Sequence, residues 1–208
     1  RKKVHNMSKY YYHGIRNISD VNTVLEIFKS GGIKSKRMQN RSYKIGFNGV
    51  DYVSVCNKVS GEEYKNFSNN AFKKYIINRF CFIIDDTITA VRPKFIGDAI
   101  NWNRIQLIKL ITSDSNIRFT DMIDEWQIKD EIPLSYIIGI GIPVKEINNF
   151  LSLHQENAIK RNIRKIIDAI IEYAINLNLD IVDSSNDSFI EEYESKKNRS
   201  QKKLNLRK

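Results

Sequence analysis

The sequence has few of the residues that hold together small disulfide-linked or metal-bound folds, with 2 cysteines, 3 histidines and 3 prolines in 208 residues. Two cysteines are too few for a disulfide framework. Both Cys56 and Cys81 lie in apolar runs, so we expect buried free thiols. No C-x-x-C or H-x-x-x-H spacing occurs, which argues against a structural zinc site. With 41% apolar residues, the chain can instead bury a hydrophobic core.

Long apolar runs are also missing. A membrane-spanning helix needs roughly 18–20 consecutive apolar residues. The nearest candidate, residues 133–143, is shorter and contains two prolines. We see no signal peptide and expect no membrane span.

Acidic residues are absent from both ends of the chain. Residues 1–9 carry four basic groups and residues 195–208 carry seven, with no Asp or Glu in either segment. Residues 10–194 carry 23 basic and 24 acidic groups, so the net charge of +10 comes from the two ends. We expect one domain over residues 10–190, flanked by basic, disordered tails that can attract polyanions.

The apolar pattern predicts a mixture of strands and helices without regular alternation. Strands are expected over residues 10–15, 51–56, 80–85 and 179–185, the run 88–93 is expected to pair with 80–85, and helices are expected over 19–30, 68–79 and 149–178. No G-x-G-x-x-G or G-x-x-x-x-G-K-[ST] loop is present. These features favour an α+β fold over a doubly wound nucleotide-binding fold.

Residues 121–143, DMIDEWQIKDEIPLSYIIGIGIP, are the most informative part of the sequence. Glu125 begins an alternating run, and a second apolar run follows over residues 134–142. We expect two short strands joined by a tight connection. Glu125 would then be held rigidly at the edge of the cleft that the sheet lines, with Glu131 as the substitute if the register differs.

Three motifs in this order resemble the ADP-ribosyltransferases, both the poly(ADP-ribose) polymerase-like group and bacterial mono-ADP-ribosyltransferase toxins. They are YYHGI followed by a helix and GGI, then FNGVDYVSVC, then DEWQIKDEIPLSYIIGI, and together they cover roughly residues 10–143. The resemblance implies a split, mainly antiparallel sheet with flanking helices and with NAD bound as a substrate in the cleft between the sheet halves. It also implies a cytoplasmic location, or another cell's cytoplasm if the protein is a toxin or effector.

The resemblance assigns a role to four residues. His13 would form hydrogen bonds with the adenosine ribose of NAD, and Gly14 would let the backbone approach the nicotinamide amide. Tyr52 would stack on the nicotinamide ring, and Glu125 would accept a hydrogen bond from the 2′-hydroxyl of the nicotinamide ribose. A carboxylate at that place stabilises the oxocarbenium character that develops as the nicotinamide–ribose bond breaks.

The basic segment 34–44 has no acidic residue and could meet the pyrophosphate of NAD, with candidates Lys36, Arg37 and Arg41. Ser54 could be the mid-strand serine that some of the toxins use. Ile123 stands where the arginine-modifying toxins carry a second glutamate, so no target preference follows. No second tyrosine is evident downstream, which favours transfer of a single ADP-ribose.

Other interpretations stay open. His13 and Tyr52 could be ordinary structural residues, and the segment 34–44 an ordinary solvated loop. A tRNA 2′-phosphotransferase-like enzyme would share the scaffold and NAD but would need basic groups at the cleft. A non-catalytic nucleic-acid-binding module would use the tails and a helical face formed by Lys160, Arg161, Arg164 and Lys165. The acceptor of an ADP-ribosyltransferase, protein or nucleic acid, is not specified by the sequence.

Overall fold

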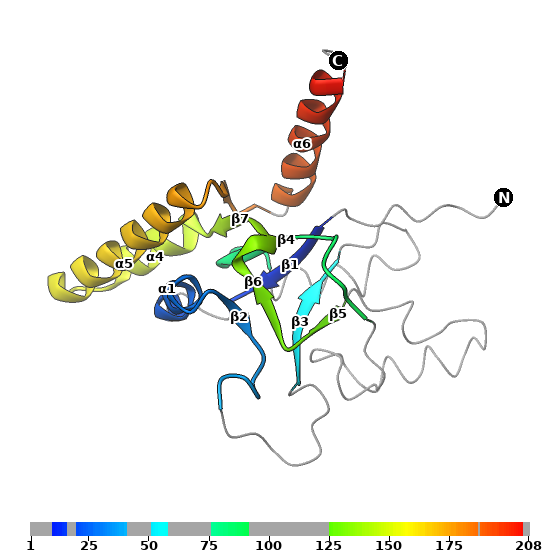
Figure 1. The fold of residues 1–208 in the computed structure, drawn as a ribbon. Helices are drawn as coiled ribbons and strands as arrows, with labels where there is room; N and C mark the ends of the chain where they lie inside the picture. The colour runs from blue at the N-terminus through cyan, green and yellow to red at the C-terminus, as the bar shows by residue number, and fades with distance from the viewer. Residues whose placement is uncertain are drawn as a thin grey trace, which may run out of the picture.

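The computed structural model describes residues 10–15, 20–40, 51–57, 76–91, 125–186 and 188–205. It confirms the predicted α+β class, with a six-stranded sheet, a two-stranded sheet and four α-helices in this part of the chain (Figure 1). The larger sheet has the order β5-β3-β1-β4-β7-β8, and only the pair β7–β8 is parallel. Its strands are β1 (Tyr10–Gly14), β3 (Tyr52–Cys56), β4 (Cys81–Asp85), β5 (Glu125–Lys129), β7 (Ile137–Ile142) and β8 (Asp180–Asp183).

Helices α1 (Val21–Lys29) and α5 (Asn157–Asn176) pack together against one face of this sheet. Apolar residues recur every three or four positions in both helices, so each buries a single stripe. Phe28 of α1 contacts both layers. Its ring lies edge-on to that of Phe82 of β4, with 5.5 Å between the ring centroids, and stacks on that of Tyr173 of α5, with 5.6 Å between the centroids. This layer fixes α1 relative to the sheet and thereby forms one wall of the cavity described below.

Helix α6 (Phe189–Asn205) covers part of the opposite face. The sequence predicted a charged tail from about residue 191, disordered over residues 195–208, whereas the structure describes residues 189–205 as a helix. Phe189, Ile190 and Tyr193 are buried against the sheet, and the Tyr193 hydroxyl donates a hydrogen bond to Asp180 at 2.7 Å. These three buried side chains, at positions i, i+1 and i+4, hold the first turns of the helix against the sheet. The residues that follow them in the helix are almost entirely polar.

Cys56 and Cys81 are both buried beneath this face, as free thiols, which confirms the expectation for the cysteines. Burial raises the pKa of the Cys81 thiol to about 12. It therefore stays protonated at neutral pH and behaves as a small apolar side chain.

The seam between β1 and β3 is the weakest join in the sheet. Only one residue pair, Tyr12 with Cys56, is in ladder register there, whereas β1 and β4 share five. Side chains replace the ladder on both sides of that pair. The Asn57 amide donates to the Tyr10 carbonyl at 3.0 Å, and the His13 imidazole bonds to the Ser54 carbonyl at 2.8 Å. The two strands therefore separate at the His13 end of the seam.

Residues 123–129 and 134–142 were expected to form two strands paired with each other. The structure contains a strand in each segment, but the two strands are not hydrogen-bonded to each other. β5 adds to β3 at one edge, and β7 adds to β4 on the far side of β1. Between them the chain forms β6 (Glu131–Pro133), which pairs with β2 (Gly32–Lys34), and a short 3₁₀ turn, Leu134–Tyr136. The alternating pattern predicts a strand and its buried face, but it does not identify the neighbouring strand.

Two further expectations change. Val91 forms a bridge with Gln127 of β5, through two hydrogen bonds of 2.8 Å, and not with residues 80–85. The helix predicted over residues 149–178 is two helices, α4 (Val144–Leu153) and α5, because the backbone of His154 and Glu156 is extended. Most of the helix expected over residues 68–79 lies outside the described residues, and residues 76–78 form a turn. Within the described ranges, no helix has the length and apolar character needed to cross a bilayer.

Candidate functional site

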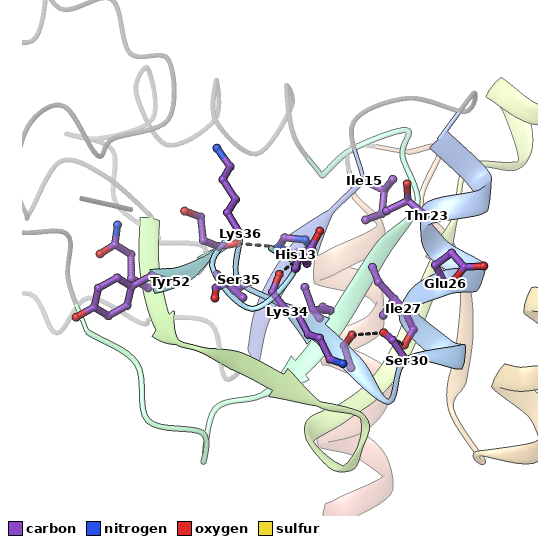
Figure 2. Close-up of a pocket in the computed structure, with 16 residues that line it drawn as sticks. His13, Ile15, Thr23, Glu26, Ile27, Ser30, Lys34, Ser35, Lys36 and Tyr52 are labelled. Atoms are coloured by element: carbon purple, nitrogen blue, oxygen red, sulfur yellow. Dashed lines mark hydrogen bonds between the residues drawn. The ribbon is translucent and has the colours of Figure 1, made fainter. Parts of the chain in front are cut away.

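A cavity of about 580 Å³ opens between α1, the β2 segment and the ends of β1, β3 and β5 (Figure 2). This volume lies within the range that binds small molecules and cofactors. The described residues that line it are His13, Ile15, Thr23, Glu26, Ile27, Ser30, Gly32, Ile33, Lys34, Ser35, Lys36, Gln39, Tyr52, Val53, Ser54 and Gln127. His13 from the first sequence motif and Tyr52 and Ser54 from the second therefore meet in one cavity.

The hydrogen bond to Ser54 fixes the protonation of His13. A carbonyl oxygen can only accept, so the Nδ1 atom of His13 carries the proton that it donates to Ser54 at 2.8 Å. In the neutral ring the Nε2 atom then has a free lone pair. Because His13 lines the cavity, it offers an acceptor for a ligand hydroxyl.

Burial lowers the pKa of His13 from its ordinary value near 6.5, and this effect outweighs the opposing effect of the hydrogen bond to Ser54. The imidazole is therefore neutral at physiological pH. A neutral ring keeps Nε2 as an acceptor, whereas protonation would turn it into a donor.

Gly14 turns its backbone toward the same gap. In an antiparallel ladder the N–H and C=O of successive residues point alternately to the two neighbouring strands. The Ile15 amide donates to the Phe80 carbonyl at 2.8 Å, so Ile15 faces toward β4. The amide and carbonyl of Gly14 consequently point away from β4, toward the side where β1 and β3 separate. A small residue at this position leaves the backbone accessible to a ligand.

Glu125 begins β5, in register with Cys56. The side chain of Glu125 lies outside the part of the chain that the structure describes, so its predicted role is not placed. Gln127 lines the cavity and is only 5% exposed. On the other face, the Trp126 ring packs against Tyr11 at 5.9 Å, which holds β5 to the core beside the candidate glutamate.

The β2 segment forms the opposite wall and brings two cations to the cavity, Lys34 and Lys36. The following turn is tied down by the buried Ser35, whose amide donates to the Asp130 carbonyl at 2.7 Å. Figure 2 shows Lys34, Ser35 and Lys36 among the labelled side chains that line the cavity together with His13.

Arg37 does not line the cavity in the structure. Its guanidinium forms a two-pronged ion pair with Asp51, in which Nη2 lies 3.3 Å from Oδ2 and Nε contacts Oδ1. Since Asp51 directly precedes Tyr52, the pair connects the turn after β2 to the start of β3. Arg41, the other arginine predicted to meet the pyrophosphate, lies outside the described residues.

Sequence reasoning missed the contribution of α1 to this cavity. Thr23, Glu26 and Ser30 all face it, although the helix was assigned only a packing role. Their spacing of three and four residues is a usable signal, because it places them on one helical face beside the apolar stripe. Gln127 was also missed, although it lies two residues after Glu125 in the alternating strand.

Among the residues that the structure describes, no group of three or more His, Cys, Asp or Glu side chains could hold a metal ion. Comparison with known proteins found no protein-family model, curated protein or solved structure that matches the chain.

Proposed function

We propose that the cavity binds NAD and that the protein transfers a single ADP-ribose from NAD to a macromolecular acceptor, with release of nicotinamide. The observation that carries the proposal is the opening between β1 and β3. There His13 presents a neutral acceptor, the backbone of Gly14 points toward the gap, and Tyr52 and Ser54 line the cavity with His13. This opening supports the proposal of an NAD cleft, which the sequence resemblance implied.

The lining can accommodate the different parts of a dinucleotide. Ile15, Ile27 and Ile33 supply apolar surface for a flat ring, and Lys34 and Lys36 supply positive charge for a pyrophosphate. In this proposal Lys36 has the pyrophosphate role predicted for it from the sequence, and Lys34 takes the role predicted for Arg37. Tyr52 would hold the nicotinamide ring and Glu125 would stabilise the sugar cation, as in the enzymes that the motifs resemble.

Replacing His13 with alanine is expected to weaken NAD binding about 5- to 30-fold, because one or two hydrogen bonds of about 1 kcal/mol each are lost. His154→Ala is a matched control, since His154 stacks on Phe150 at the end of α4. Titration calorimetry of both variants, with melting curves to confirm folding, checks the prediction. If His13→Ala binds NAD with an unchanged dissociation constant, His13 has only a structural role.

The affinity of the wild-type protein for NAD should stay constant at neutral pH and decline only below about pH 6.5. The pKa of His13 is lowered, so the imidazole gains a proton and loses its acceptor only in that acidic range.

A double-mutant cycle separates two roles for Arg37. If Arg37 acts through Asp51 by holding the turn after β2, Arg37→Ala and Asp51→Ala should weaken NAD binding equally, and the double variant should be no weaker than either. If Arg37 contacts phosphate directly, Asp51→Ala should leave affinity unchanged or raise it. We expect the first pattern, with a loss of less than about 1 kcal/mol in apo stability because both side chains are partly exposed.

A tRNA 2′-phosphotransferase-like reaction is the second candidate, and the lysines at the cavity favour it over a non-catalytic module. Incubation with labelled NAD and cell lysate, followed by mass spectrometry, distinguishes the candidates. ADP-ribose on protein or on a nucleic-acid base supports the primary proposal, and loss of an RNA 2′-phosphate supports the second. Absence of any NAD-dependent melting shift at millimolar NAD would contradict both.

A further inference from the structure

Helix α5 carries a concentrated basic surface in its N-terminal half. We call the residues Lys160, Arg161, Arg164 and Lys165 the α5 basic face. Arg161, Arg164 and Lys165 are exposed and Lys160 is partly exposed. At 100° per residue, the four cations are centred roughly 130° from the buried stripe of the helix. Figure 1 shows this yellow half of α5 at the end of the helical layer that lies away from the sheet.

Intramolecular pairing does not account for this charge. In the described ranges, none of the four cations has an ion pair or a side-chain hydrogen bond. The helix has no acidic residue in its first turn, and its carboxylates, Asp168 and Glu172, follow in the C-terminal half. That order is opposite to the order that the helix dipole favours, because cations are stabilised at a C-terminus and anions at an N-terminus. Within the helix itself, which follows the N-cap residue Glu156, this order of charges is therefore unfavourable.

We propose that the α5 basic face binds the phosphate groups of a nucleic acid. Two arginines and two lysines within about two helical turns offer bidentate and point-charge contacts to successive phosphates. The positions between them are Asn162, which is exposed, and Ile163, which is buried, so the face has no apolar side chain to insert into a membrane. The inference rests on α5 alone and holds whether or not the cavity binds NAD.

The test is fluorescence anisotropy with a labelled 20-nucleotide RNA and a 20-base-pair DNA, without NAD, from 50 to 200 mM salt. The test variant replaces Lys160, Arg161, Arg164 and Lys165 with glutamine, which preserves helix propensity. The matched control replaces Arg1, Lys2, Lys3 and Lys9 with glutamine and lowers the net charge equally, from +10 to about +6. Melting curves confirm that both variants fold.

On duplex DNA, the test variant should lose about 3 to 4 units from the slope of log affinity against log salt, because each phosphate contact contributes roughly 0.9. The control should lose a clearly smaller part of the wild-type slope and affinity, because its four cations lie in the terminal segment and not on this face. Equal losses in the two variants would overturn the proposal, since overall charge and not this face would then govern binding. Equal affinity of wild-type protein for polyglutamate, or for vesicles with anionic lipid, would also overturn it.

Discussion

Glu125→Gln is expected to lower the rate of ADP-ribose transfer and of NAD hydrolysis by about 10²–10³-fold, with little change in NAD affinity. The substitution keeps the shape of the side chain and removes the charge that would face the developing sugar cation. A loss confined to kcat would show that the interaction forms in the transition state and not in the bound substrate. Steady-state kinetics of nicotinamide release, with calorimetry for affinity, measure both quantities.

Glu131→Gln is the matched control, because it removes the same charge six residues later. Glu131 belongs to β6 and stands opposite Lys34 in the two-stranded sheet. We expect this variant to keep most of the wild-type rate. The reverse result, with activity retained in Glu125→Gln and lost in Glu131→Gln, would move the catalytic role to the β2–β6 pair.

Gly32→Ala is expected to destabilise the protein by about 3 kcal/mol and to lower the melting temperature by roughly 6–12 °C. A Cβ atom at position 32 would overlap the carbonyl oxygen of Ile132 and lie 3.1 Å from the Cα of Pro133. These are backbone atoms of the paired strand β6, so they cannot move without breaking the β2–β6 ladder. Because Gly32 also lines the cavity, NAD affinity should fall with stability.

The neighbouring glycine provides the control for this substitution. Gly31 has a positive φ of +85°, but a Cβ there would meet nothing within 4 Å. Gly31→Ala should therefore cost only the left-handed backbone strain, about 1–2 kcal/mol. Differential scanning calorimetry of the two variants tests the ranking. Equal or inverted losses would show that the close approach at Gly32 relaxes without cost.

The sequence by itself determined the local elements and several members of the candidate site. Short apolar or alternating runs identified β1, β3, β4 and β5, and the apolar stripe identified α1, because both patterns are properties of a short segment. The motifs around His13, Tyr52 and Ser54 also selected three residues that line one cavity. Position 125 was placed correctly at the head of a strand, and its role remains a prediction.

Only the tertiary structure decided which strands are neighbours and which charges reach the cavity. β5 and β7 are consecutive apolar runs, yet three other strands separate them, because pairing depends on the whole sheet and not on a local pattern. Lys34 lines the cavity while Arg37 pairs with Asp51, a choice that depends on a contact across 14 residues. Burial against the sheet likewise turned the start of the expected tail into α6. Such outcomes follow from long-range contacts, which composition and periodicity do not encode.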